Sequence, residues 1–390
     1  MSATRYELMH GNHVAASVSI SDEGLIASIN GIVDRDRMPW GTVGSDDNDT
    51  LVRLRDWWKY RRIPRKRDIG ETIRRLGFAS NDELMVAGLA ANLSDHYWIR
   101  PLGDDLCWDD VSPFTNSFSE TLGRTLLGIG DGFEPSPDCS TDGMVPKMWT
   151  SDRRMLKGGT TRCRQQPYNE VLASEIMRRL GIDHVPYELT SLGSETFCTY
   201  PCIASEDVEM VQARCLMMTA PLVEGETMFS HLLDRCESIG LDNPRRFIDR
   251  MIAVDHIMGN NDRHYNNFSI MRDPDTLEVL GFAPIYDTGS SLGYDVPAAD
   301  IGRMSIRGRT FKAELDRQLH LLDDTEWLDL SRLDGIGDYA RRLMGSSDTI
   351  SDERLDAVVG LLDSRISTLE EHIRRPREFR DVPSEDIPVR

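Results

Sequence analysis

The sequence predicts an α+β protein with two lobes, a small β-rich lobe followed by a larger helical lobe, and an N-terminal extension of strands and helices. Its 390 residues exceed the size at which one hydrophobic core usually suffices. Strand-like runs cluster before residue 222, and apolar residues at helical spacing follow Glu224. The predicted boundaries are 1–100 for the extension, 101–137 for a linker, 138–222 for the small lobe, 223–378 for the large lobe and 379–390 for a loose tail.

The composition is that of an ordinary soluble protein, with 39% apolar and 28% charged residues. A formal net charge of −20 argues against a surface that holds nucleic acid non-specifically, because such binding depends on neutralising phosphates. Seven scattered cysteines, an odd number, do not form a disulfide framework and indicate reduced thiols. No signal peptide and no membrane-length apolar run occur. We therefore expect a cytoplasmic protein without membrane or direct nucleic-acid contacts.

The N-terminal extension begins with strands and continues with helices. Residues 5–33 alternate apolar and polar side chains, which suggests a β-hairpin. Apolar residues at helical spacing from Leu51 to Trp58 predict a helix that ends before Pro64. Residues 101–137 are rich in Asp, Gly, Ser and Pro and contain only short apolar pieces, so they are interpreted as a linker.

Residues 53–67 form a basic stretch with eight Lys or Arg and one Asp, interleaved with Trp57, Trp58 and Tyr60. One interpretation is a nucleic-acid patch, since aromatic stacking and cations cooperate at such sites. The other is a helix that buries its tryptophans while its cations lie in solvent or pair with carboxylates. Charge runs on helices are usually solvated faces, so we favour the second.

The small lobe is predicted to combine several strands with one helix. Pro167 is expected near the start of a helix that runs to Leu180 and stops at Gly181. The predicted strands are 147–149, 154–157, 185–192, 195–203 and a buried strand at 213–222.

The large lobe is predicted to be helical. Pro244 opens a helix that ends at Gly259. Two further amphipathic helices are expected at Thr325–Met344 and Ser351–Ile373, the second capped by Ser351. The tail after Pro376 is charged and expected to be loose.

Three polar residues suited to chemistry on a phosphate lie between His256 and Gly293. Asp262 and Asn267 share one loop, and Asp287 follows a short apolar run. Mg²⁺ prefers hard oxygen ligands and keeps several waters, so one carboxylate and one amide oxygen suffice to hold it. Asn267 and Asp287 supply that pair. Asp262 is placed to accept the proton of an attacking hydroxyl.

A cation for phosphates and its partner occur upstream. Lys157 ends the apolar strand in MLKGG, with Lys147 as its nearest competitor, and Glu170 on the following helix is suited to pair with it. The order Lys, Glu, Asp, Asn, Asp is that of a protein kinase, so we expect a bilobal kinase-like fold with a cleft between the lobes. His264 is expected to order the Asp262 loop rather than to act as a base.

Several motifs resemble those of the HipA-like kinase family. DHIMGNNDRHYNNF followed by APIYDTGSSL resembles the family's catalytic loop of the form N-x-D-x-H-x-x-N-F, and it is also similar to the D-R-H-x-x-N loop of phosphatidylinositol kinases. STDGMVPK resembles the loop that covers the nucleotide, and MLKGG with PYNEVLASEIMRRLGI resembles the lysine strand and its helix. The resemblance spans about 138–375.

The resemblance implies roles for particular residues. Asp262 would be the catalytic base and Lys157 the lysine that binds ATP. Asn267 and Asp287 would hold Mg²⁺. The other residues that it implies beside the nucleotide are Glu170, His264, the loop residues Ser140, Thr141 and Gly143, and the hinge residues Met217, Met218 and Thr219.

One position departs from the family pattern. In members that are toxins, a serine of the nucleotide-covering loop can be autophosphorylated, and Asp142 stands at that place here, next to Ser140 and Thr141. Self-inactivation at this position stays open, because the hydroxyls of Ser140 and Thr141 are adjacent and autophosphorylation is a further expectation.

The residues and the resemblance together predict an ATP- and Mg²⁺-dependent protein kinase that phosphorylates a Ser or Thr hydroxyl of another protein. The resemblance further implies a toxin role with a neutralising, antitoxin-like partner. An alternative is a pseudokinase, a nucleotide-binding regulatory module without turnover. A lipid kinase ranks lower, because no polybasic amphipathic helix for membrane docking is evident. The substrate stays open.

Overall fold

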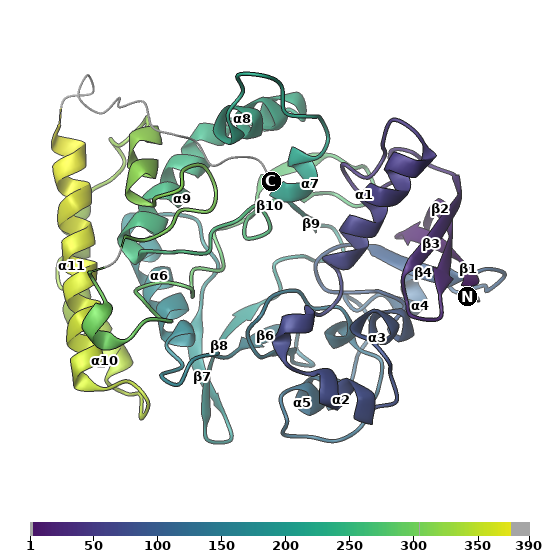
Figure 1. Ribbon diagram of the computed structural model, residues 1–390, viewed down its shortest axis with the longest axis horizontal. Coiled ribbons are helices and arrows are strands. Elements are labelled where there is room, and N and C mark those ends of the chain that lie inside the picture. Colours follow the sequence, from purple (N-terminus) through teal and green to yellow (C-terminus); the bar gives the residue numbers. More distant parts are fainter. Residues whose placement is uncertain (1–2, 304, 376–390) are drawn as a thin grey trace. The chain divides into compact units, whose positions relative to one another are not determined.

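The computed structural model describes residues 3–303 and 305–375, which form two compact units (Figure 1). Among the described residues, the first unit comprises 3–157, 201–221 and 270–280, and the second comprises 158–200, 222–269, 281–303 and 305–375. The predicted loose tail lies outside the described residues.

The first unit begins with a four-stranded antiparallel sheet in the order β3-β2-β1-β4. Its strands are β1 Ala3–His10, β2 His13–Ser21, β3 Ile26–Ile32 and β4 Tyr97–Pro101. The predicted hairpin at 5–33 is thus three strands instead of two. The missed turn joins β1 to β2 at Gly11, whose φ of 55° lies in the left-handed region that glycine adopts without strain.

Short helices follow the sheet in the first unit. They are α1 Asp47–Lys59, η1 Arg65–Arg67, α2 Gly70–Arg75, α3 Asn81–Ala87, α4 Trp108–Val111, α5 Thr121–Leu126 and η2 Pro137–Cys139. The core beneath the sheet contains Leu54, Trp57 and Trp58 of α1. The indole N–H of Trp58 donates to the Gly24 carbonyl at 2.9 Å, which fixes α1 against the β2–β3 turn.

The basic stretch at 53–67 is a packed segment whose cations find partners. Trp57 and Trp58 are buried. The ion pairs in this stretch include Arg53–Asp49 at 2.9 Å, Arg61–Asp95 at 2.5 Å and Arg62–Asp82 at 3.3 Å. The favoured interpretation, buried tryptophans with paired cations, is confirmed.

Two strand groups complete the first unit. Strands β5 Lys147–Trp149 and β6 Arg154–Lys157 form the predicted antiparallel pair. Strands β9 Glu209–Gln212, β10 Ser269–Arg272 and β11 Val279–Phe282 form a sheet in the order β11-β10-β9. The buried strand predicted at 213–222 is wrong, because Ala213–Met217 is a helix, α7. A short apolar run satisfies either a buried strand or a buried helix, so periodicity alone could not decide.

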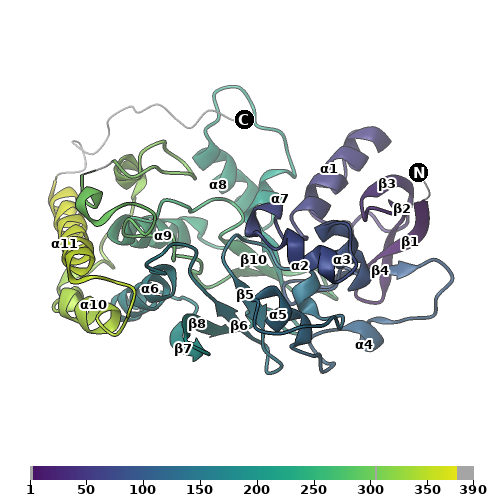
Figure 2. The ribbon, with the colours of Figure 1, turned by 60° about the horizontal axis from the view of Figure 1, so that its bottom comes forward.

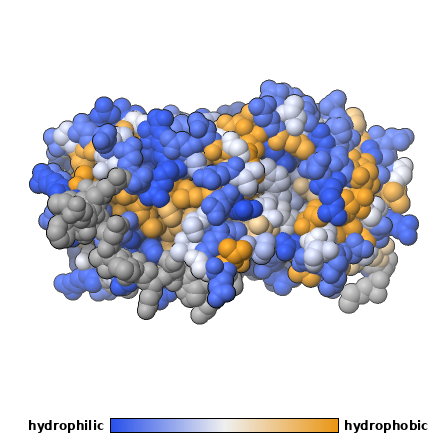
Figure 3. Space-filling model, turned by 90° about the horizontal axis from the view of Figure 1, so that it is seen from above, coloured by the Kyte–Doolittle hydropathy of each residue, from blue (hydrophilic) through white to orange (hydrophobic). Residues whose placement is uncertain are grey.

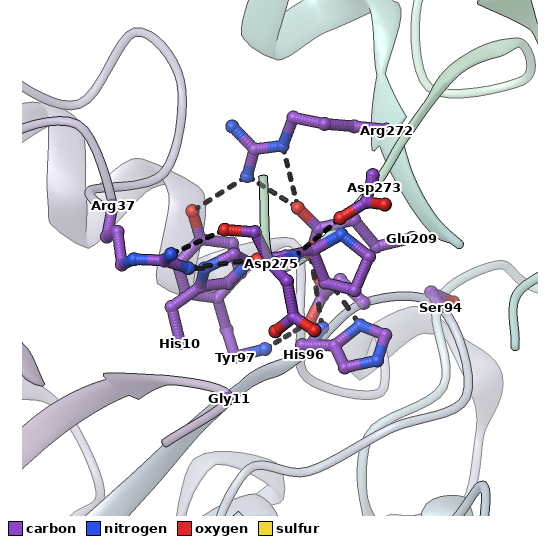
Figure 4. Close-up of polar contacts among 12 residues, drawn as sticks. His10, Gly11, Arg37, Ser94, His96, Tyr97, Glu209, Arg272, Asp273 and Asp275 are labelled. Carbon is purple, nitrogen blue, oxygen red and sulfur yellow. Dashed lines mark hydrogen bonds and ion pairs between the residues drawn. The ribbon is translucent and has the colours of Figure 1, made fainter. Parts of the chain in front are cut away.

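A buried ionic network joins the N-terminal sheet to β9 and β10 (Figure 4). The Glu209 carboxylate contacts His10 Nε2 at 2.9 Å and accepts a hydrogen bond from Arg272 Nε at 2.7 Å. Arg272 also donates to the Tyr97 hydroxyl at 3.3 Å. Burial opposes the charge of Glu209, but His10 and Arg272 outweigh burial and lower its pKa to about 2. The carboxylate is therefore ionised at neutral pH.

The second unit is built around helix α9. Its elements are α6 Gln166–Leu180, β7 Glu188–Leu192, β8 Glu195–Pro201, α8 Met228–Ser238, α9 Pro244–Met258, η3 Ala298–Asp300, η4 Asp316–Leu321, η5 Leu330–Leu333, α10 Ile336–Met344 and α11 Asp352–Arg374. Figures 1 and 2 show α9 beside α6 and α11, and it also contacts α8.

Local capping signals explain where the long helices of the second unit begin and end. Gly181 and Gly259 follow α6 and α9 with φ of 69° and 58°, as predicted. The Ser351 side chain accepts the Arg354 N–H at the start of α11. The single helix predicted at 325–344 is wrong, because η5 and α10 are separated at Gly335, whose φ of 73° ends helical geometry.

The face of the molecule seen in Figure 3 is mainly polar. On this face, hydrophilic residues predominate and hydrophobic residues form separate patches. Val33, Val52 and Val223 are exposed apolar residues of the kind that ordinary protein surfaces carry. Across the described residues, no helix combines the length and apolar character needed to cross a bilayer.

Candidate active site

The loop that carries Asp262 and Asn267 is held in place by hydrogen bonds from its own asparagine side chains. It starts where α9 ends, and Asn260 Nδ2 donates to Asp255 at 2.8 Å while its Oδ1 accepts the Asp262 N–H at 3.0 Å. Asn267 Nδ2 donates to the Asp262 carbonyl at 2.9 Å. The structure thus holds the two predicted residues in one tightly bonded turn of the second unit.

Arg263 ties this loop to the segment that carries Asp287. Its guanidinium donates to the Asn267 and Tyr286 carbonyls, each at 2.5 Å, and binds both oxygens of Asp255 on α9. Burial of the guanidinium opposes its charge, but the Asp255 carboxylate outweighs burial and raises the Arg263 pKa. One permanently charged, buried group therefore fixes the backbone beside both predicted magnesium ligands.

Glu170 of α6 is hydrogen-bonded to the backbone directly after Asp287. Its buried carboxylate accepts the Thr288 N–H at 2.8 Å. A Cβ at Gly289 would lie 2.9 Å from Glu170 Oε1, so a larger residue there would push the Glu170 carboxylate aside. Asp287 itself has a φ of 58°. The predicted partner Lys157 belongs to the other unit, and the ion pair between them stays a prediction.

Asp262 and His264 differ in their surroundings. The Asp262 carboxylate is 36% exposed and pairs with the exposed Arg309 at 3.0 Å, so solvent reaches it. His264 Nδ1 accepts the Asn266 N–H at 3.2 Å, and its carbonyl accepts the Asn267 N–H at 2.8 Å. These bonds agree with the predicted ordering role of His264. A direct role of His264 at a nucleotide stays a prediction.

The donor set of this loop fits a hydrated magnesium ion. Because Asn267 Nδ2 is used by the Asp262 carbonyl, the oxygen of that amide is the atom left to act as a ligand. Asp287 adds a carboxylate. The Oδ1 of the neighbouring Asn266 is buried without a hydrogen-bond partner, which suits a place where metal-bound water would supply a donor.

In the first unit, the loop with Ser140, Thr141 and Gly143 is held by contacts with the N-terminal extension, and Ser140 and Thr141 are buried while Gly143 is partly buried. The Ser140 hydroxyl donates to the Arg61 carbonyl at 2.7 Å, and the Arg67 guanidinium binds Thr141 and Gly143. Burial lowers the pKa of Arg67 to about 10, so it stays charged at neutral pH. The loop is therefore anchored by the N-terminal extension.

Lys157 is buried at the end of β6, and Lys147 lies directly opposite it on β5. Residues opposite each other in an antiparallel pair project to the same face, so the two lysines share one face of this strand pair. A Cβ added at Gly143 would lie 2.6 Å from Lys147 Nζ, so the loop lies against the end of the Lys147 side chain. Lys147 therefore remains the closest competitor of Lys157.

The predicted hinge residues follow helix α7. Met217 ends the helix, and the Thr219 N–H and hydroxyl both bond to the Leu216 carbonyl, at 3.0 and 2.6 Å. Arg53 of α1 donates to the Met218 carbonyl at 3.1 Å. This segment is a helix end fixed by α1.

Two important residues were missed from the sequence, Arg263 and Arg67. For Arg263 a signal existed, since Asp255 lies on the apolar face of the α9 segment and a buried acid requires a buried cation. For Arg67 the only signal was its place in a basic stretch, because its partners are more than 70 residues away.

Comparisons with known proteins agree with the motifs. The family model of the HipA-like C-terminal domain matches residues 139–346. A search of the curated proteins found no match.

The solved structures similar to the chain include the following two. One is the Helicobacter pylori proinflammatory kinase CtkA, with 18% identity, 58% of this chain and 93% of that chain covered and a TM-score of 0.47. The other is HipA of Shewanella oneidensis MR-1, from a toxin–antitoxin complex with HipB and operator DNA, with 14% identity, 97% and 100% covered and a TM-score of 0.56. The second likeness shows a shared fold. Because the family model matches more than half of the chain, the chain belongs to the HipA-like family.

Proposed function

We propose that this protein is a kinase that transfers the γ-phosphate of ATP to a Ser or Thr hydroxyl of a protein, with Mg²⁺ as the cofactor. The observation that carries the proposal is the loop of the second unit, where Asp262 and Asn267 are hydrogen-bonded together and Arg263 links them to the Asp287 segment. Membership of the HipA-like family supports the same chemistry.

Asp262 is the proposed catalytic base. Phosphoryl transfer requires a positioned hydroxyl more than covalent help from the protein. The Asp262 carboxylate is accessible to a substrate, and its backbone is fixed on both sides by Asn260 and Asn267. It would orient the hydroxyl and take its proton as the bond to phosphorus forms.

Asn267 and Asp287 are the proposed magnesium ligands. Mg²⁺ neutralises charge on the phosphates when bound. The rigid backbone around Arg263 keeps the two ligands in place, which lowers the reorganisation needed when charge develops.

The first unit would supply the nucleotide contacts. Lys157 is the proposed phosphate lysine, and Ser140, Thr141 and Gly143 are in the proposed nucleotide-covering loop. Met217, Met218 and Thr219 are the proposed adenine-contacting hinge. Glu170 is the proposed partner of Lys157, and His264 is a further candidate beside the nucleotide.

A neutralising protein partner is part of the proposal. The similar HipA structure contains HipB as the second protein of a toxin–antitoxin system. A growth-inhibiting role with an antitoxin-like partner would follow if this chain acts in the same way.

The direct test incubates the purified protein with Mg²⁺, γ-labelled ATP and a cell lysate. Wild type should label Ser or Thr residues, identified by mass spectrometry. Asp262→Ala and Asp287→Ala should reduce labelling by about 100-fold or more, because they remove the base and a metal ligand. Asp300→Asn, an exposed acid on η3, is the matched control and should label like wild type.

Equal background labelling by all four proteins would refute the catalytic claim. If Mg²⁺ and ATP then raised the melting temperature of the wild type without transfer, the pseudokinase would be the better description. Label found only in lipid would favour a lipid kinase.

A further inference from the structure

Three arginines of the N-terminal extension bind three segments of the first unit, and the proposed function uses two of these segments. Arg67 binds the loop at 141–143, and Arg53 binds the carbonyl of Met218 in the hinge. Arg37 donates to two carbonyls of the turn between β10 and β11, at 2.9 and 2.6 Å (Figure 4). These contacts are made mainly to main-chain carbonyls, so they fix backbone, and Arg67 also donates to the Thr141 hydroxyl. Of the three, the Arg67 contact is the most extensive.

The Arg67 guanidinium makes five hydrogen bonds to three consecutive residues. Nε and Nη2 donate to the Gly143 carbonyl at 2.9 and 2.7 Å. Nη2 also donates to the Thr141 and Asp142 carbonyls, each at 2.8 Å, and Nη1 donates to the Thr141 hydroxyl at 2.8 Å. The planar guanidinium has five N–H groups and can donate to this many acceptors at once, whereas the ammonium group of a lysine cannot.

Arg67 is itself held rigidly. It ends the one-turn helix η1, whose N-cap is Pro64, and the next residue, Asp68, has a φ of 46°. The residues on either side belong to one hydrophobic cluster, in which Ile63 and Ile69 pack with Cys139, two residues before Thr141. The extension and the loop thus share a core.

Because the carbonyls of residues 141–143 all point toward Arg67, the orientation of the loop's N–H groups is also set. In a trans peptide the N–H points opposite to the C=O, and the described residues contain no cis peptide. The N–H groups of Asp142, Gly143 and Met144 therefore lie on the side away from Arg67. Successive N–H groups of this kind bind phosphate in many proteins.

One N–H of that outward side already meets an anion. The Asp142 carboxylate accepts the Gly143 N–H at 2.6 Å. Gly143 has a φ of 87°, a left-handed value that glycine adopts without strain. A phosphate oxygen bound to the Gly143 N–H would take the place of the Asp142 carboxylate as its acceptor.

We propose that Arg67 is a positioning residue of the nucleotide site. It gathers the carbonyls of residues 141–143, so that the loop N–H groups face the phosphates of a bound nucleotide. The N-terminal extension is then an integral part of the site in addition to any role with partners. This inference rests on the proposed function in one respect, that the loop covers a nucleotide.

The test compares wild type with Arg67→Lys. The variant keeps the charge but loses the planar guanidinium, so the loop should open more often and bind Mg·ATP less well. In the absence of nucleotide, amides in the peptide spanning 140–144 should exchange with deuterium about tenfold faster in Arg67→Lys than in wild type. The Kd of the variant for Mg·ATP should be about tenfold higher than that of wild type. The kcat at saturating ATP should change by less than about threefold, since the chemical groups are untouched.

Arg55→Lys is the matched control. Arg55 also donates to two carbonyls, those of Ile26 and Ala27 at 2.7 and 2.8 Å, but these belong to the N-terminal sheet. It should change neither loop exchange nor the Kd. Thr141→Val removes a single acceptor of Arg67 and should shift both readouts in the same direction by less, which covers the case in which Arg67→Lys does not fold.

The proposal is overturned if Arg67→Lys matches wild type in loop exchange and Kd, or if Arg55→Lys shifts both equally. If the variants alter loop exchange but not the Kd, Arg67 holds the loop without serving the nucleotide, and the proposal is also wrong. A wild type that binds no Mg·ATP would refute the proposed function instead. The exchange comparison would still show whether Arg67 holds the loop.

Discussion

At the scale of single residues, this protein places several charged groups in its interior and hydrogen-bonds some of them to main-chain groups. Arg263 and Arg67 each bind two or more main-chain carbonyls, and Glu170 accepts a main-chain N–H. Such contacts fix a loop more strongly than surface ion pairs, because solvent does not screen them. Asp138 is a buried acid that is satisfied only in part.

Asp138 gives a pH dependence that can be measured. Its Oδ1 accepts the Trp149 N–H at 2.9 Å, and its Oδ2 is buried without a hydrogen-bond partner. Burial raises its pKa from 3.8 to about 7. Between these values the folded protein holds a proton that the unfolded chain has lost, so the free energy of unfolding should decrease as pH rises through this window and level off above it.

Urea unfolding at pH 5, 6, 7 and 8 checks this expectation. Asp138 should contribute a slope of at most about 1.4 kcal/mol per pH unit below pH 7. Asp138→Asn titrates nowhere in this range and should lack that part of the slope. Identical slopes in the two proteins would show that Asp138 is ionised in the folded state throughout.

Residues that belong to a local sequence motif could be identified from the sequence. Residues whose partners lie far away in the chain could not. Asp262, His264 and Asn267 are recognisable because they lie within one loop. Arg263 in the same loop was passed over, since its role depends on Asp255 on a helix and on the Tyr286 carbonyl. Long-range pairing of this kind leaves little trace in residue spacing.

At the scale of elements, helix α6 is the part of the second unit that holds the Asp287 segment. Asn169 donates to the carbonyls of Gly289 and Ser291 at 2.9 and 2.7 Å, and Glu170 accepts the Thr288 N–H. The helix therefore positions three residues that follow Asp287. Glu170 has two candidate roles, this brace and the proposed ion pair with Lys157.

Glu170→Gln separates the two roles of Glu170. The amide oxygen of Gln can still accept the Thr288 N–H, so the free energy of unfolding should change by less than about 1 kcal/mol. The negative charge is lost, so if Lys157 depends on it, the kcat/KM for ATP should fall by about tenfold or more. Asn169→Ala is the matched control for the brace and should lower stability more than Glu170→Gln does. Unchanged activity in Glu170→Gln would exclude the ion pair as a functional contact.

Elements with local start and stop signals were predictable, and short apolar runs were not. The helix of α9 begins at Pro244 and ends before Gly259, as the sequence indicates. The run at 213–222 was assigned to a strand, yet its first five residues form α7, because the partner surfaces that select helix over strand lie elsewhere in the chain.

At the scale of the whole molecule, the N-terminal extension is a structural partner of the segments that surround it in the first unit. The core of its sheet includes Val211 of β9 and Cys215 of α7, and the Glu209 network joins its first strand to β10. The α+β composition and the family were predictable from the sequence. The role of residues 1–100 was not, because it is expressed only in contacts with distant segments.

The most direct test of the central claim measures Mg·ATP affinity and phosphate transfer in the same samples of wild type and Asp262→Asn. The account predicts a Kd within about threefold of wild type and a single-turnover transfer rate lower by about 100-fold or more, because only the base is lost. An Asp262→Asn protein that transfers phosphate at the wild-type rate would contradict the account.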